Sequence, residues 1–195
     1  MLKQLFKLLG YETFKRGLHI YFEKFAWGNT TLTDFVSCLD TAHQETKGSF
    51  SVQEWCNVWL TSSGINIIEP IVEWDDSIAS LTILQTCDLR GKNLLRMQKL
   101  NIGFYNSSGS LYKIEDVVIC DSATVIDVSQ IPESFGPVSA IFINEGEHAY
   151  AKVRFDERSK DWFVQNLHKV SDAVTRGAVW RYFWFAVLER RMTSL

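Results

Sequence analysis

The sequence predicts a chain in which helices and strands occupy separate segments. We expect a helical N-terminal segment, a seven-stranded antiparallel β-sandwich and a helical C-terminal segment. Apolar residues recur at helical spacing over residues 1–64, and short β-rich runs separated by turn residues fill residues 65–156. The helical spacing then returns over residues 157–195. The predicted domain boundaries follow these three ranges.

The first two helices are predicted from apolar periodicity and from the glycines that follow them. Apolar residues between Leu2 and Leu9 follow the i, i+3, i+4, i+7 spacing of one helix face, and Gly10 is suited to end that helix. A second helix is expected from Glu12 to Phe25, with the Gly28-Asn29 pair breaking it.

Two further helices are predicted from their N-terminal caps. Thr31 with Asp34, and Ser51 with Glu54, have the spacing of a capping box, and an apolar periodic run follows each pair. Gly64 is suited to close the second of these helices.

The strands are predicted from short β-rich runs and from the turns between them. The turns at Asn106–Gly109 and Glu145–Gly146 favour antiparallel hairpins. Leu100–Phe104 alternates between apolar and other residues, the period of a half-buried strand. The seven runs are Ile67–Glu73, Ser80–Gln85, Lys99–Tyr105, Leu111–Ile119, Ala123–Val128, Ala140–Asn144 and Ala149–Phe155.

Two helices are predicted in the C-terminal segment. Asp156 or Ser159 could cap the first, and Ser171 or Asp172 could cap the second, which runs from Ala173 to about Met192. The second helix is apolar almost all round, so we expect it to be buried. Too little helical sequence follows in this chain to cover it, which suggests a truncated helical domain.

Bulk properties exclude several classes of function. The net charge of −3 and the pI of about 5.8 argue against a nucleic-acid partner. The longest apolar run, Ala178–Leu188, would span only about 16 Å as a helix, so no membrane span is expected. The four cysteines form no C-x-x-C pair and suit free, buried thiols in a reducing compartment, so we expect a cytoplasmic protein.

No catalytic motif occurs in the sequence. There is no H-E-x-x-H zinc motif, nucleophile elbow, P-loop or G-x-G-x-x-G, and no two of the four histidines lie four residues apart. We interpret His19 as a packed or surface residue. His43 and His168 lie near predicted helix C-termini, where the helix dipole favours a cationic imidazole.

Two acidic groups were weighed as sites. Glu145, Glu147 and His148 place three potential metal ligands within four residues, but we interpret them as a charged turn between strands. A second acidic group, formed by Glu73, Asp75 and Asp76, is interpreted as a solvated strand end. The serine-rich residues 106–110 are interpreted as a hairpin tip. We therefore assign no catalytic, cofactor-binding or metal-ligating residue.

Several stretches resemble the aminopeptidase N family of zinc exopeptidases, and they occur in the family's order. Residues 3–35 resemble the closing helices of the family's thermolysin-like catalytic domain, and Trp59–Asn66 its exit into the β-sandwich. Ala149–Glu157 is similar to the last strand of that sandwich, and Val174–Trp180 to an early helix of the C-terminal helical domain. The cytosolic, bacterial-like branch of the family is the most similar.

The resemblance implies a zinc-dependent enzyme that removes N-terminal residues from peptides. The family's zinc motif, its amine-binding Gly-x-Met-x-Asn and its transition-state Tyr all precede the matching region, and Tyr11 does not match that Tyr. We therefore expect no cofactor in this chain, zinc in the complete enzyme, and the remaining catalytic and helical domains as partners. The alternatives are a non-catalytic scaffold that binds protein and, on fold class alone, a carbohydrate-binding sandwich.

Overall fold

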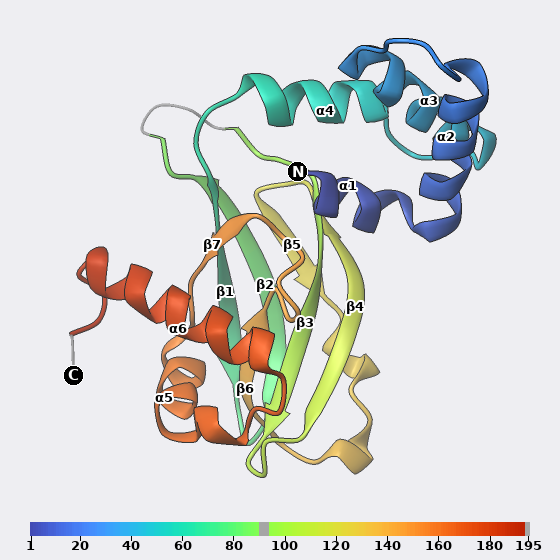
Figure 1. The fold of residues 1–195 in the computed structure, drawn as a ribbon. Coiled ribbons are helices and arrows are strands. Elements are labelled where there is room, and N and C mark those ends of the chain that lie inside the picture. Colours follow the sequence, from blue (N-terminus) through green and yellow to red (C-terminus); the bar gives the residue numbers. More distant parts are fainter. Residues whose placement is uncertain (90–93, 194–195) are drawn as a thin grey trace. The chain divides into compact units, whose positions relative to one another are not determined.

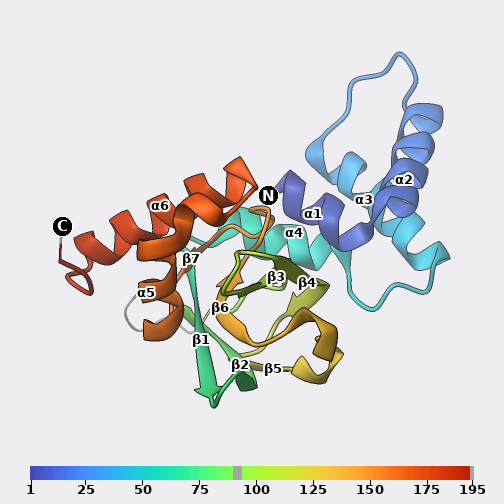
Figure 2. The ribbon, with the colours of Figure 1, turned by 90° about the horizontal axis from the view of Figure 1, so that it is seen from below.

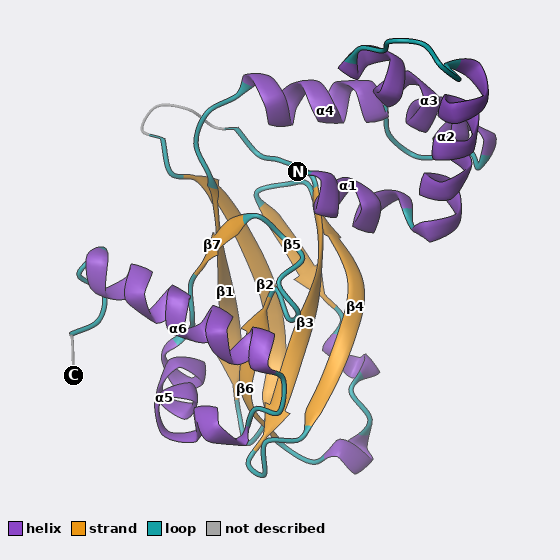
Figure 3. Cartoon of the chain, viewed as in Figure 1, coloured by secondary structure: helices purple, strands orange, loops and turns teal. Residues whose placement is uncertain are grey.

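The computed structural model describes residues 1–89 and 94–193, which form helices and two β-sheets in separate stretches of the chain (Figure 1). The chain divides into two compact units, residues 1–63 and residues 64–195. The first unit is helical, and the second holds all of the described strands with two further α-helices (Figure 3). A separate boundary near residue 156 stays a prediction.

The first unit consists of four helices, and the predicted N-caps Thr31 and Ser51 begin the third and fourth. The first helix ends at Gly10 as expected, but the fourth ends at Thr61 with Ser62 as its C-cap, so the expectation that Gly64 closes it is wrong. Thr31 accepts a hydrogen bond from the Asp34 amide, and Asp34 accepts one from the Thr31 amide at 2.8 Å, which completes the predicted capping box. Ser51 accepts from the Glu54 amide at 3.2 Å. The helices are α1 (Leu2–Leu9), α2 (Tyr11–Lys24), α3 (Leu32–Glu45) and α4 (Val52–Thr61).

Helices α2 and α3 meet at a glycine. A Cβ on Gly17 would lie 2.6 Å from Cδ2 of Leu39, so the missing side chain allows the two helices to approach closely. Leu39 is fully buried beneath it. On the exposed side, the Arg16 guanidinium donates to both carboxylate oxygens of Glu45, at 2.9 and 3.0 Å.

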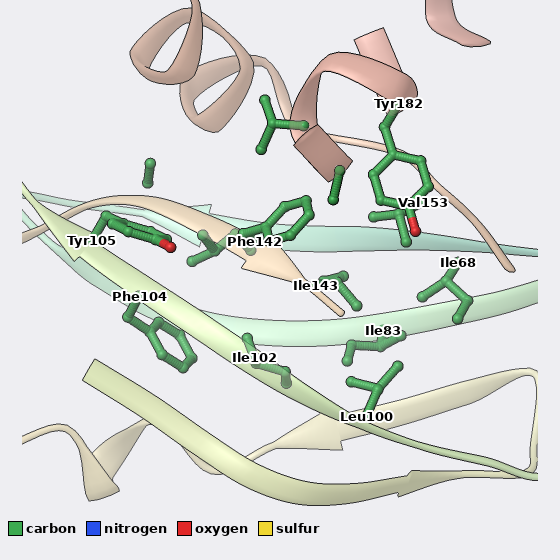
Figure 4. Packing of buried hydrophobic residues seen from close by; sticks show 14 of the residues in the cluster. Ile68, Ile83, Leu100, Ile102, Phe104, Tyr105, Phe142, Ile143, Val153 and Tyr182 are labelled. Atoms are coloured by element: carbon green, nitrogen blue, oxygen red, sulfur yellow. The ribbon is translucent and has the colours of Figure 1, made fainter. Parts of the chain in front are cut away.

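The second unit contains a four-stranded sheet, ordered β5-β2-β1-β7, and a three-stranded sheet, ordered β4-β3-β6. Their strands span Asn66–Trp74 (β1), Ile78–Cys87 (β2), Gln98–Asn106 (β3), Leu111–Ile119 (β4), Ala123–Ile126 (β5), Val138–Ile143 (β6) and Ala151–Val153 (β7). Both sheets contribute side chains to one hydrophobic cluster, among them Ile68 and Ile83 from the first and Leu100 and Ile102 from the second (Figure 4).

One strand pairing contradicts the expected antiparallel arrangement. β7 runs parallel to β1, with Asn66 opposite Ala151 and Ile68 opposite Val153. The chain leaves β6 in the three-stranded sheet, turns, and enters the other sheet at its edge, so β7 is not the return strand of a hairpin with β6. The tight Glu145–Gly146 turn therefore joins two sheets, whereas the sequence pattern indicated a hairpin.

Strand β3 is buried on both faces, and the expectation of a half-buried strand is wrong. Leu100, Ile102 and Phe104 are fully buried. The residues that alternate with them are buried as well, since Asn101 is only 5% exposed and Tyr105 only 1% exposed. β3 is the central strand of its sheet, and Tyr105 packs against Trp162 and Phe163 of helix α5 (Glu157–Asn166), with ring centroids 5.6 and 5.3 Å apart.

Helices α5 and α6 (Ala173–Leu188) lie side by side (Figures 1 and 2). Each begins at a predicted cap, because Asp156 accepts from the Ser159 amide and Asp172 from the Thr175 amide. Only part of the second helix is buried, in agreement with the expectation that this chain supplies too little helical sequence to cover it. Residues such as Val179 and Phe183 are buried, whereas the opposite face is not covered by described residues.

The cysteines are free, but two of them are not buried as expected. Cys38 and Cys56 lie inside the first unit, and burial raises the pKa of Cys56 to about 11. Cys87 is half-buried at the end of β2, and Cys120 is exposed just after β4. Cys87 is the last residue of its strand and Cys120 comes directly after one, where the chain leaves the sheet and side chains are less covered.

Candidate functional site

Buried polar groups gather at the turn that follows β6, from Asn144 to Ala149, where Asn144 and Glu145 are both buried. Asn144, Gly146 and Glu147 all have positive φ, at 74°, 74° and 57°. Such angles cost energy in residues with a side chain, so surrounding contacts must hold the turn in this shape. The amides of Asn144 and Glu145 both donate to the carbonyl of Asn101 in β3, at 2.9 and 3.0 Å.

The Asn144 side chain forms hydrogen bonds within the turn and to α6. Its side-chain oxygen accepts from the Ala149 amide at 2.6 Å, and its amide group donates to the Ala149 carbonyl at 3.0 Å. The same amide group donates to the hydroxyl of Tyr182 at 3.1 Å. Asn144 is fully buried, so these bonds satisfy a polar side chain that is cut off from water.

Glu145 is a buried carboxyl group between β3 and α6. Its exposed fraction is 2%, and its Oε2 accepts from the Tyr105 hydroxyl at 2.9 Å while its Oε1 lies 2.7 Å from the Thr175 hydroxyl. A Cβ on Gly103 would lie 2.8 Å from Oε2, so this glycine makes room for the carboxyl. Burial raises the pKa of Glu145, while the bonds from Thr175 and Tyr105 and the charge of Lys113 oppose that shift.

Glu147 contacts side chains of α6. Its carboxylate pairs with Arg181 and accepts a hydrogen bond from the Tyr182 hydroxyl at 3.2 Å. Glu145 and Glu147 therefore bond to different groups, and the three potential ligands of this turn do not converge. Within residues 1–89 and 94–193, no group of three or more His, Cys, Asp and Glu side chains could hold a metal ion.

The second acidic group also lacks the geometry of a reaction centre. Glu73 accepts from the Ser80 hydroxyl at 2.8 Å, and Asp75 and Asp76 are exposed. Arg158 donates to the backbone carbonyls of both aspartates and its guanidinium lies 4.3 Å from the centre of the Trp74 ring. These contacts close the β1–β2 hairpin.

The histidines are dispersed, and the expected cation at His43 is wrong. His43 is 8% exposed, stacks on Phe50 at 4.5 Å between ring centroids, and has no hydrogen-bond partner for either ring nitrogen among the described residues. Burial lowers its pKa, and the attraction of the Asp40 charge only partly opposes that shift. His19 instead lies on the surface, 3.1 Å from Glu23.

An apolar groove lies between α5 and α6. Its volume is about 320 Å³, and Phe163, Leu167, Phe183 and Met192 contribute to its lining. Trp180 and Trp184, which also line it, are 67% and 60% exposed. Single exposed apolar residues are common, but two tryptophans one helical turn apart form a patch of the kind that binds another protein surface.

The sequence search missed the residues that hold Glu145. Thr175, Tyr105 and Gly103 belong to a helix and a strand far apart in the chain, and no local pattern links them. The sequence signal near these residues is Asp172, which is predicted as a possible helix cap and does cap α6 by accepting from the Thr175 amide.

Comparison with curated proteins shows a similarity to a protein named as a peptidase. The chain is 30% identical over 193 residues to the protein named aminopeptidase N from Streptomyces lividans. The chain is aminopeptidase N-like. The match covers 94% of this aminopeptidase N-like chain but only 22% of that relative's length. No family model matches the sequence. None of the described helices has the length and hydropathy needed to cross a bilayer.

Proposed function

We propose that this chain is a framework portion of a zinc-dependent aminopeptidase, an enzyme that hydrolyses N-terminal residues from peptides, and that the chain alone is inactive. The observation that carries the proposal is the similarity to aminopeptidase N along 94% of the chain. A match that continues through the helices and both sheets is better explained by shared architecture than by a chance likeness of one motif.

The proposed placement within such an enzyme follows the order of the sequence motifs. Residues 1–64 would form the helical end of the catalytic domain, residues 65–156 a linking β-sandwich, and residues 157–195 the start of a helical domain. The partners would be the rest of those domains and, in the complete enzyme, a peptide. A cytoplasmic location and the lack of a nucleic-acid partner belong to the same proposal.

The described residues do not fit a catalytic zinc ion. Such an ion needs three converging protein ligands and an open position. Glu145 is bonded to two hydroxyl groups, Glu147 is paired with Arg181, and the two ring nitrogens of His43 are buried without a hydrogen-bond partner among the described residues. We therefore derive no catalytic step through zinc from this chain.

The test is an activity assay on the purified 195-residue chain. We expect no hydrolysis of an aminoacyl-anilide above the rate with buffer, with or without added zinc. The complete Streptomyces lividans protein, assayed in parallel, shows that the substrate and conditions are suitable. Turnover by the isolated chain that a chelator abolishes would overturn the proposal.

A second candidate function is a non-catalytic scaffold that binds another protein, and the α5–α6 groove is the observation that favours it. Trp180, Trp184 and the 61% exposed Leu188 lie at i, i+4 and i+8 on one face of α6. Both candidates predict that this face drives association of the isolated chain. Sedimentation should show oligomers that the double variant Trp180→Gln/Trp184→Gln reduces, and a stable wild-type monomer would contradict that expectation.

The DNA upstream of Met1 separates the two candidates. A continuous reading frame that encodes H-E-x-x-H would favour the enzyme portion. A promoter and a start of transcription immediately before Met1, mapped by sequencing transcript ends, would favour the scaffold.

A further inference from the structure

Three oxygen atoms form a row at the start of α6. Glu145 Oε1 lies 2.7 Å from Thr175 Oγ1, and Thr175 Oγ1 lies 2.8 Å from Asp172 Oδ2. Both separations are at the most frequent value for O–H···O hydrogen bonds. Each contact therefore needs a hydrogen atom between its two oxygens.

The row contains too few hydrogens if both carboxyl groups are ionised. A threonine hydroxyl carries one hydrogen, and an ionised carboxylate only accepts. Thr175 can then donate its hydrogen in only one of the two contacts. In the other contact, lone pairs of two oxygen atoms would repel each other. The Tyr105 hydroxyl cannot fill the gap, because it donates to the other oxygen of Glu145, Oε2. The missing hydrogen must belong to one of the two carboxyl groups.

The surroundings of the two carboxyl groups decide which one carries it. Asp172 caps α6, and its Oδ2 also accepts from the Thr175 amide at 2.8 Å. These bonds and the positive end of the helix dipole stabilise its charge, and its pKa is lowered. Glu145 is 2% exposed, so its charged form is poorly hydrated and its pKa is raised.

We propose that Glu145 is a neutral carboxylic acid in the folded chain over a pH range in which a free glutamate has lost its proton. Glu145 Oε1–H donates to Thr175, Thr175 donates to the ionised Asp172, and Tyr105 donates to Glu145 Oε2. Every hydrogen in this row is then used once. We call this hydrogen-bonded row of Glu145, Thr175 and Asp172 the latch. It joins the turn after β6 to the first turn of α6 while Glu145 keeps its proton.

The other charged groups near the latch are few. Lys113 in β4 and Asp172 act on Glu145 with opposite signs, and Glu147 in the same turn is paired with Arg181. Removing the proton from Glu145 would leave a buried charge and an oxygen contact without a hydrogen. We therefore expect the first turn of α6 to loosen as the pH rises through the pKa of Glu145 in the folded chain. The proposal concerns the chain's own fold and does not depend on its enzymatic role.

The direct test is a carbon-13 NMR titration of the Glu145 side-chain carboxyl in the folded 195-residue chain. The expected midpoint lies above the value of about 4.3 for a free glutamate. A midpoint at or below that value would overturn the proposal, and this measurement needs no variant.

Asp172→Asn provides the second test. The Asp172 charge favours the protonated form of Glu145, so removing that charge should lower the midpoint. Asp127→Asn changes another capping aspartate, one that accepts from the Ser129 amide, and should leave the midpoint unchanged. An unchanged Glu145 midpoint in folded Asp172→Asn, or an equal fall in Asp127→Asn, would contradict the latch.

Discussion

The hydroxyl of Tyr105 donates a 2.9 Å hydrogen bond to the carboxyl of Glu145, and this bond joins the middle of one sheet to the turn that leaves it. Both side chains are at most 2% exposed. Because both groups are buried, neither can exchange this bond for a bond to water. The bond therefore holds the loop at Glu145 in place, and Glu145 also contacts Thr175 at the start of α6.

Tyr105→Phe should therefore destabilise the second unit by about 1–2 kcal/mol, the cost of leaving a buried acceptor without its donor. Urea denaturation measures the change. Tyr112→Phe is the matched control, since the Tyr112 hydroxyl donates to the Gln130 carbonyl on the surface, and its loss should cost less. Equal effects of the two changes would contradict the buried role of Tyr105.

Gly103→Ala and Gly177→Ala should have opposite effects. A Cβ at 103 would lie 2.8 Å from Glu145 Oε2 and 3.0 Å from Leu111, so we expect a loss of about 1–3 kcal/mol from overpacking. At 177, in α6, no atom other than the neighbouring residues and backbone of the same helix lies within 4 Å of the added Cβ, and alanine should stabilise the helix by about 0.5–1 kcal/mol. Thermal unfolding of both variants checks the signs, and stabilisation by Gly103→Ala would rule out the close approach of Glu145.

His43 should make the first unit less stable in acid. Its pKa in the folded chain is lowered, so below the ordinary value of about 6.5 the unfolded chain binds a proton that the folded chain does not. Stability should therefore decrease as the pH falls below that value. Circular dichroism during urea unfolding at several pH values measures this decrease.

The controls for His43 are two substitutions. His43→Leu should weaken the decrease below pH 6.5, whereas His19→Gln, at an exposed position, should retain it. An equal decrease in His43→Leu and in the wild-type chain would contradict the role of His43.

A charge network at the end of α6 should contribute a salt-dependent stabilisation. Glu189 accepts from Arg154 at 3.0 Å and lies 3.5 Å from Lys152, while Arg154 also bonds to Glu69 at 3.2 Å. Glu189→Gln should cost about 0.5–1 kcal/mol at low ionic strength and less at high ionic strength, because these groups are partly exposed. An effect that does not change with salt, or one matched by the exposed Glu133→Gln, would count against an electrostatic origin.

Local chemistry in the sequence predicted most helix starts, because a cap needs only a few neighbouring residues. Thr31, Asp156 and Asp172 all serve as the caps that their spacing indicated. The strand positions also followed from short β-rich runs. These features depend on contacts within one turn or one strand.

The candidate site could not be predicted, because it depends on contacts between distant elements. Alternation in β3 indicated which residues share a face, but not that α5 would cover the face of Tyr105. The parallel pairing of β7 with β1 likewise depends on how the chain crosses between sheets. Glu145 looked like a surface turn residue for the same reason, since Gly103 and Thr175, which make its pocket, lie 42 and 30 residues away along the chain.

The most direct measurement of the central claim is the zinc content of the purified 195-residue chain. The chain would be incubated with zinc, dialysed, and measured by plasma mass spectrometry beside the complete Streptomyces lividans aminopeptidase N. If this chain is framework without the metal-binding part, it should retain far less than one zinc ion per molecule. Stoichiometric zinc that survives dialysis, and that is lost when Glu145, Glu147 or His148 is replaced by alanine, would contradict that claim.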